Sequence, residues 1–77
     1  MTTLEKTVSE LDAYKRRVGR KFDRARTRED LIWYFNKYNE IEDTIIDLVY
    51  TYHTPRKAKP NKLKVESLTR RLEQCSK

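Results

Sequence analysis

The sequence has very few of the residues that stabilise small proteins by means other than packing. Its 77 residues include one cysteine, Cys75, and one histidine, His53, so a disulfide framework is excluded and a zinc site is hard to assemble. One glycine and two prolines are too few for the tight turns of a sheet. No apolar run approaches the length of a membrane span, and Glu5 and Glu10 stand where a signal peptide would be basic and then apolar. We therefore expect an all-α, intracellular protein that is cytoplasmic or nuclear and makes no contact with a membrane.

Residues that could carry catalysis are also missing. The sequence contains no glycine-rich phosphate loop, no histidine beside a nucleophile and no paired carboxylates in an apolar setting. His53 is expected at the C-terminus of a helix, where an imidazolium is favoured by the helix dipole. We therefore expect a protein that is not an enzyme and that uses no cofactor and no metal.

The first predicted helix carries an apolar seam with a heptad spacing. The seam begins at residue 1 and runs to about residue 26, with spacings of three and four throughout. It consists of Met1, Leu4, Val8, Leu11, Lys15, Val18, Phe22 and Ala25. Lys15 is the one charged member, and it either sets the register or oligomeric state, or extends out to solvent. Gly19 lies within the helix and indicates a slight kink or a close contact there.

A second helix is predicted from about Arg28 to Tyr52. Thr27 and Asp30 have the spacing of a helix-capping box, so the chain is expected to turn near residue 27 and form an antiparallel hairpin. The apolar face of this second helix is broader than one partner helix can cover, so a second chain or a third helix must cover the rest. We predict a homodimeric helical bundle, which would also extend a core that is small for one domain. The predicted partner interface consists of Trp33, Tyr34, Tyr38, Ile41, Ile45 and Leu48.

The predicted organisation is one domain with three parts. Residues 1–53 form the hairpin, residues 54–61 a basic linker flanked by prolines, and residues 62–77 a short amphipathic helix. That helix is expected to pack across the open end of the hairpin or against a dimer mate. Trp33 lies off the main seam of the second helix, so it is a stacking surface for a base, an anchor for a partner or part of a dimer core.

The net charge of +6 is divided into blocks of opposite sign. Residues 15–28 contain eight basic residues against Asp23, whereas residues 29–53 contain six acidic residues against Lys37. At 100° per residue, most of the first block faces away from the apolar seam. It can contact the phosphates of a nucleic acid, form a solvated face balanced by the acidic helix, or meet an acidic protein or a membrane surface. The predicted nucleic-acid-binding residues are Arg16, Arg17, Arg20, Lys21, Arg24 and Arg28, with Arg56, Lys57 and Lys59 in the linker.

Two functions of different class remain after these considerations. The first is a nucleic-acid-binding protein that contacts backbone phosphates and prefers duplex RNA, although DNA is possible. Its plan of a few helices, a dimer and a basic face is similar to that of viral suppressors of RNA silencing, such as the nodaviral one, and of the RNA-binding domain of the influenza non-structural protein. The similarity is one of architecture only, since no motif matches. The second is a small helical adaptor or inhibitor that binds a host protein through Trp33 and Tyr34.

Overall fold

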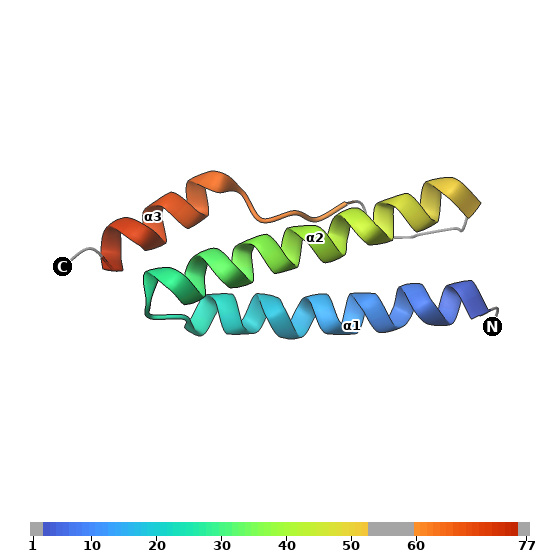
Figure 1. Cartoon of the computed structure of the whole chain (residues 1–77), viewed down its shortest axis with the longest axis horizontal. Coiled ribbons are helices and arrows are strands. Elements are labelled where there is room, and N and C mark those ends of the chain that lie inside the picture. Colours follow the sequence, from blue (N-terminus) through green and yellow to red (C-terminus); the bar gives the residue numbers. More distant parts are fainter. Residues whose placement is uncertain (1–2, 53–59, 76–77) are drawn as a thin grey trace.

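The computed structural model describes residues 3–52 and 60–75, and these form three helices (Figure 1). They are α1 (Thr3–Arg24), α2 (Arg28–Tyr52) and α3 (Val65–Cys75). The molecule is elongated, with extents of 48 × 18 × 16 Å. The all-α prediction is confirmed for the described part of the chain, where there is no strand. Among residues 3–52 and 60–75, none of the helices combines the length and the hydrophobicity that a membrane span requires.

The turn between α1 and α2 follows the capping residues that the sequence contains. The Thr27 hydroxyl accepts a hydrogen bond of 3.1 Å from the Asp30 backbone N–H, and the Thr27 carbonyl accepts one of 3.0 Å from Leu31. The first bond satisfies an N–H group that has no backbone partner in the first turn of a helix, and the second is the first backbone bond of α2 itself. The predicted start of α2 at Arg28 is confirmed, whereas α1 ends at Arg24, two residues earlier than expected. We call this end of the hairpin the turn end.

Two buried clusters of side chains hold the hairpin together. The cluster at the turn end consists of Phe22, Ala25, Leu31 and Phe35, and the rings of Phe22 and Phe35 lie 6.3 Å apart. The cluster in the middle of the hairpin consists of Val8, Val18, Tyr38, Ile41 and Ile45. All the α1 members were expected from the seam spacing. Gly19 has the close contact that the sequence suggested, because a Cβ there would lie 3.0 Å from a ring carbon of Tyr38.

A buried ion pair interrupts the apolar core between α1 and α2. The Lys15 ammonium lies 2.5 Å from a Glu42 carboxylate oxygen, 3.6 Å from Asp12 and 5.5 Å from the centre of the Tyr38 ring. Glu42 is 0% exposed. Glu42 is therefore the buried acidic residue of α2, whereas the other five acidic residues of that helix are exposed. Glu42 follows Tyr38 by four residues and precedes Ile45 by three, a spacing that places it on the buried face of α2.

The segment before α3 packs along α2. The Asn39 side chain donates to the Leu63 carbonyl over 3.2 Å and accepts from the Leu63 N–H over 2.7 Å, which pairs both polar groups of one backbone unit. Asn61 donates to the Tyr38 hydroxyl over 3.2 Å, and Lys62 pairs with Asp43. Leu63 contacts both clusters. The predicted third helix is therefore three residues too long at its start, because residues 62–64 are not helical.

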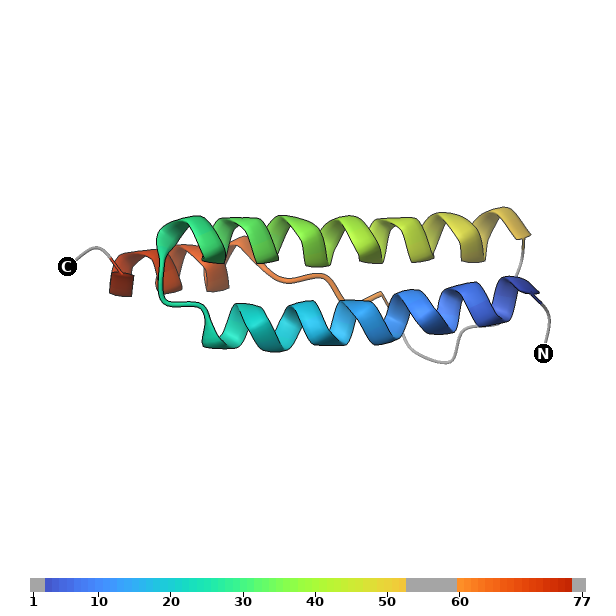
Figure 2. The same ribbon diagram turned by 60° about the horizontal axis from the view of Figure 1, so that its bottom comes forward.

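Helix α3 lies at the turn end of the hairpin, where it covers the cluster around Phe22 (Figures 1 and 2). The expectation that it would cross the open end of the hairpin is wrong. The Arg71 guanidinium donates to the carbonyls of Asp23 and Ala25, each over 3.0 Å, and lies 5.5 Å from the centre of the Phe22 ring. The Cys75 thiol donates to the Arg26 carbonyl over 3.2 Å. Carbonyls at the end of a helix have no partner inside it, so α3 supplies theirs.

Candidate nucleic-acid interface

The exposed face of α1 carries five cationic side chains, which we call the basic stripe. Its members are Arg16, Arg17, Arg20, Lys21 and Arg24, all exposed. Within residues 3–52 and 60–75, none of the five forms an ion pair or a side-chain hydrogen bond. Unpaired guanidinium groups keep their full capacity to donate to phosphate oxygens in the two-pronged geometry that arginine favours.

Two of the four acidic residues between positions 40 and 47 of α2 pair with lysines outside the basic stripe. Glu42 and Asp12 both face Lys15 inside the hairpin, and Asp43 pairs with Lys62 before α3. Within the described residues, no ion pair joins the basic stripe to the acidic middle of α2.

The stripe is not uniform around the axis of α1. Lys21 and Arg24 line a shallow hollow of about 370 Å³ at the turn end, together with Asp30 and Tyr34 of α2. Arg16 lies 140° from Lys21 at 100° per residue, on the other flank of α1. Lys21 and Arg24 therefore border α2, whereas Arg16 lies on the opposite flank of the stripe.

Aromatic side chains continue this surface from the stripe onto α2. Trp33 is 55% exposed and contacts Tyr34 edge to face, with their ring centres 5.2 Å apart. Tyr14 of α1 is 41% exposed, and the Lys37 ammonium lies 6.0 Å from the centre of its ring. We call Tyr14, Trp33 and Tyr34 the aromatic patch.

A second hollow lies beside the aromatic patch. It measures about 190 Å³ and is lined by Trp33, Asn36, Lys37 and Glu40. Tyr14 and Lys37 were not among the predicted site residues. The sequence contains a signal for both residues. Tyr14 precedes Lys21 by seven residues and therefore shares a face of α1 with it, and Lys37 follows Trp33 by four residues and therefore shares a face of α2 with it.

The predicted partner interface is divided by the structure into buried and accessible parts. Tyr38, Ile41 and Ile45 are buried in the core of the chain itself, so a second chain cannot cover them. Tyr34 and Leu48 are half-buried, and Trp33 is the exposed member of the set. The surplus of apolar surface on α2 is reduced by Leu63, Leu68 and Leu72, which pack on the cluster at the turn end.

The remaining predicted nucleic-acid-binding residues fall into two groups. Arg28 is exposed at the first position of α2, close to the turn. The basic linker residues Arg56, Lys57 and Lys59 lie outside the described residues.

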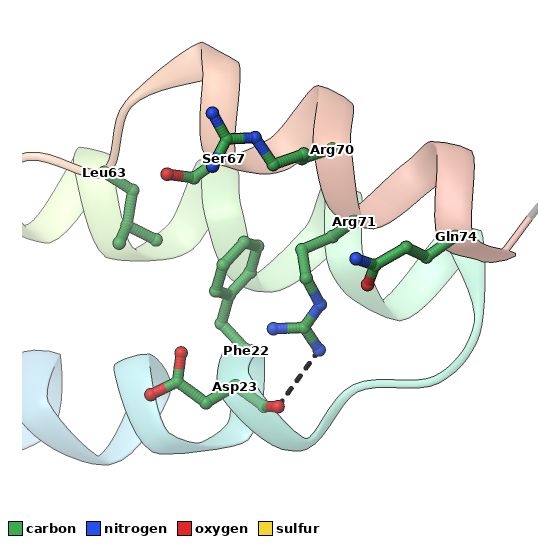
Figure 3. Close-up of a pocket in the computed structure, with 7 residues that line it drawn as sticks. All are labelled: Phe22, Asp23, Leu63, Ser67, Arg70, Arg71 and Gln74. Carbon is green, nitrogen blue, oxygen red and sulfur yellow. Dashed lines mark hydrogen bonds between the residues drawn. The ribbon is translucent and has the colours of Figure 1, made fainter.

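Arg70 and Arg71 have different surroundings although they are neighbours in the sequence. They line a hollow of about 320 Å³ between α3 and the end of α1. Figure 3 shows Arg71 reaching across this hollow to the Asp23 carbonyl, whereas Arg70 lies along α3 beside Ser67. Arg71 therefore holds α3 in place, and Arg70 is exposed.

Comparisons with family models, with curated proteins and with solved structures found no match to this chain. The function is therefore argued from the contacts and charges of the chain itself.

Proposed function

We propose that this protein binds nucleic acid without catalysing a reaction and that the basic stripe contacts the phosphate backbone. The observation that carries the proposal is the absence of partners for all five stripe cations within the described residues. Cations whose charge is balanced by acidic residues of the same chain would form ion pairs, as Lys62 does with Asp43. Unpaired cations aligned on one helix can instead replace the counterions of a polyanion, and release of these counterions drives binding.

Duplex RNA is the ligand that we favour, with DNA as the next choice. Arg16, Arg20 and Arg24 follow one another at intervals of four residues, so they span about 12 Å along α1. This row can contact several phosphates along one edge of a groove. Duplex RNA is recognised mainly through phosphates, 2′-hydroxyls and shape, which needs no code for bases. Sequestration of silencing RNA is one role that such a protein would fit.

A homodimer is part of the proposal. Ile32, Tyr50 and Tyr52 remain exposed on α2, although α3 is docked. A second copy that covered part of this surface would bring two basic stripes together. Doubling the number of phosphate contacts steepens the salt dependence and increases the affinity.

The proposal is tested by fluorescence anisotropy with duplex RNA, duplex DNA and single strands over a series of salt concentrations. We expect binding that weakens steeply with salt and a change in slope of about one for Arg20→Ala, with all sequences affected alike. Arg70→Ala is the matched control, because it removes the same charge from an exposed position outside the stripe and should leave the slope nearly unchanged. Absence of binding at low salt would refute the proposed function.

The second candidate is an adaptor or inhibitor that binds a host protein, and the exposure of Trp33 favours it. Exposed tryptophans are frequent anchors of protein interfaces. The two candidates differ in their response to salt. A protein partner anchored by Trp33 would bind with a shallow salt dependence and would be lost in Trp33→Ala, whereas Arg20→Ala would have little effect.

A further inference from the structure

The surroundings of Trp33 suit a flat ligand with polar edges. Its indole is restrained by the edge-to-face contact with Tyr34, and 55% of the side chain is exposed. The adjoining hollow of about 190 Å³ is lined by Asn36, Lys37 and Glu40. The Asn36 amide can donate and accept hydrogen bonds, and the Glu40 carboxylate can accept them, as the edges of nucleobases require. A phosphate would be repelled by Glu40, so this hollow differs in chemistry from the basic stripe.

Cations lie on both sides of the aromatic patch, where they can bind the phosphates that precede and follow a base stacked on the Trp33 indole. Lys37 lies between the second hollow and Tyr14, over whose ring its ammonium is placed at 6.0 Å. Lys21 and Arg24 lie beyond Tyr34 in the hollow at the turn end. Aromatic rings set between cations are the arrangement by which proteins bind unpaired nucleotides, since every base has a face that can stack.

We propose that Trp33 stacks on an unpaired nucleobase, with Asn36 and Glu40 at the base edge and Lys21, Arg24 and Lys37 on the flanking phosphates. This inference rests on the proposed function and narrows its ligand. Bases inside a continuous duplex have no free face, so the preferred RNA carries unpaired nucleotides next to a paired region. The basic stripe then contacts the paired region, and the aromatic patch contacts the unpaired nucleotides.

The protein carries its own reporter for this contact, because Trp33 is the only tryptophan in the chain. The probes are a long, fully paired duplex RNA, in which ends are few, and the same duplex with a short single-stranded gap. We expect both to bind, and only the gapped RNA to quench the Trp33 emission and shift its spectrum. We also expect the gapped RNA to bind about tenfold more tightly than the continuous duplex, because stacking of one base on an aromatic ring has an effect of this order.

Trp33→Ala should remove this tenfold preference and leave binding of the continuous duplex unchanged. The matched control is Val65→Ala, which shortens an apolar side chain that is 68% exposed on α3, outside the aromatic patch, and should preserve the preference. The proposed function holds and this inference fails if both RNAs bind with a steep salt slope but neither changes the emission. Failure of both RNAs to bind at low salt overturns both proposals. Equal quenching by poly-glutamate would also overturn the inference, since the patch would then bind acidic polypeptides.

Discussion

Replacing one partner of the buried Lys15–Glu42 pair should destabilise the protein far more than replacing both. The two charged groups lie 2.5 Å apart, with Glu42 fully buried and the Lys15 side chain 7% exposed. Loss of one partner leaves the other charge in the core, at a cost of about 3–5 kcal/mol. A chain of this length has a free energy of unfolding of roughly 4–12 kcal/mol, so Lys15→Met or Glu42→Leu alone should remove a large part of it.

The double variant Lys15→Met/Glu42→Leu should regain most of this loss. It removes both charges of the buried pair and fills the same space with apolar atoms, a change that is often neutral or stabilising, and it leaves Asp12 with a side chain that is 28% exposed to solvent. We expect its free energy of unfolding to lie within about 1 kcal/mol of the original, which gives a coupling energy of several kcal/mol in the double-mutant cycle.

Urea unfolding followed by circular dichroism measures each variant. With a denaturant dependence of about 1 kcal/mol per molar urea, a loss of 3 kcal/mol lowers the midpoint by about 3 M. The matched controls are Lys6→Met and Glu40→Leu, which remove the same charges from exposed positions and should change stability by less than about 0.5 kcal/mol. The reasoning is refuted if the single variants cost less than about 1 kcal/mol, or if the double variant loses as much as the two singles together.

Three further predictions concern the way the helices are held together. Arg71→Ala should release α3 and increase amide hydrogen exchange there, at a cost of about 1–3 kcal/mol for the carbonyls that lose their donor, whereas Arg70→Ala should leave exchange unchanged. Gly19→Ala should lower the melting temperature despite a gain of about 1 kcal/mol in helix propensity, because the new methyl group meets a tyrosine ring that is buried and hydrogen-bonded; a rise in the melting temperature would show that the ring yields. Asn39→Ala should expose the segment before α3 to proteolysis while α1 and α2 stay protected, and uniform sensitivity along the chain would contradict this.

The parts of the fold that follow from local pattern could be predicted from the sequence. Thr27 and Asp30 have the spacing of a cap, and the start of α2 follows them directly. The spacing of three and four residues placed Val18 and Phe22 on the face that is buried. These predictions succeed because a helix repeats its geometry, so position in the sequence fixes the direction of a side chain.

The parts that depend on backbone groups could not be predicted. Arg71 finds the carbonyls of Asp23 and Ala25, and Asn39 pairs with the backbone of Leu63. Every residue has such a carbonyl, so no pattern of side chains marks where an arginine or an asparagine will bind. The position of α3 at the turn end follows from these contacts.

The burial of Glu42 could be predicted in part, because the sequence shows its partner Lys15 within the apolar seam of the first helix. A lysine in an apolar seam needs an anion opposite, and the hairpin register places Lys15 within one turn of Glu42. Counting apolar residues alone hides this, because the same helix position that suits leucine also accepts a paired carboxylate. The aromatic patch was hidden in a similar way, because it is assembled from Tyr14 on one helix and Trp33 on the other.

The antiparallel arrangement of α1 and α2 also gives the molecule a polarity that its net charge does not express. The peptide dipoles of the two helices oppose each other, so the electric dipole along the 48 Å axis comes mainly from the side chains. Arg20 and Arg24 lie in the last turns of α1, next to the turn end, whereas Asp43 and Asp47 lie in the half of α2 that is farther from it. Such a dipole turns the protein as it diffuses in the field of a polyanion, so that the turn end arrives first. Dissolved salt would then lower the rate at which the protein and the polyanion associate, in addition to weakening the complex that they form.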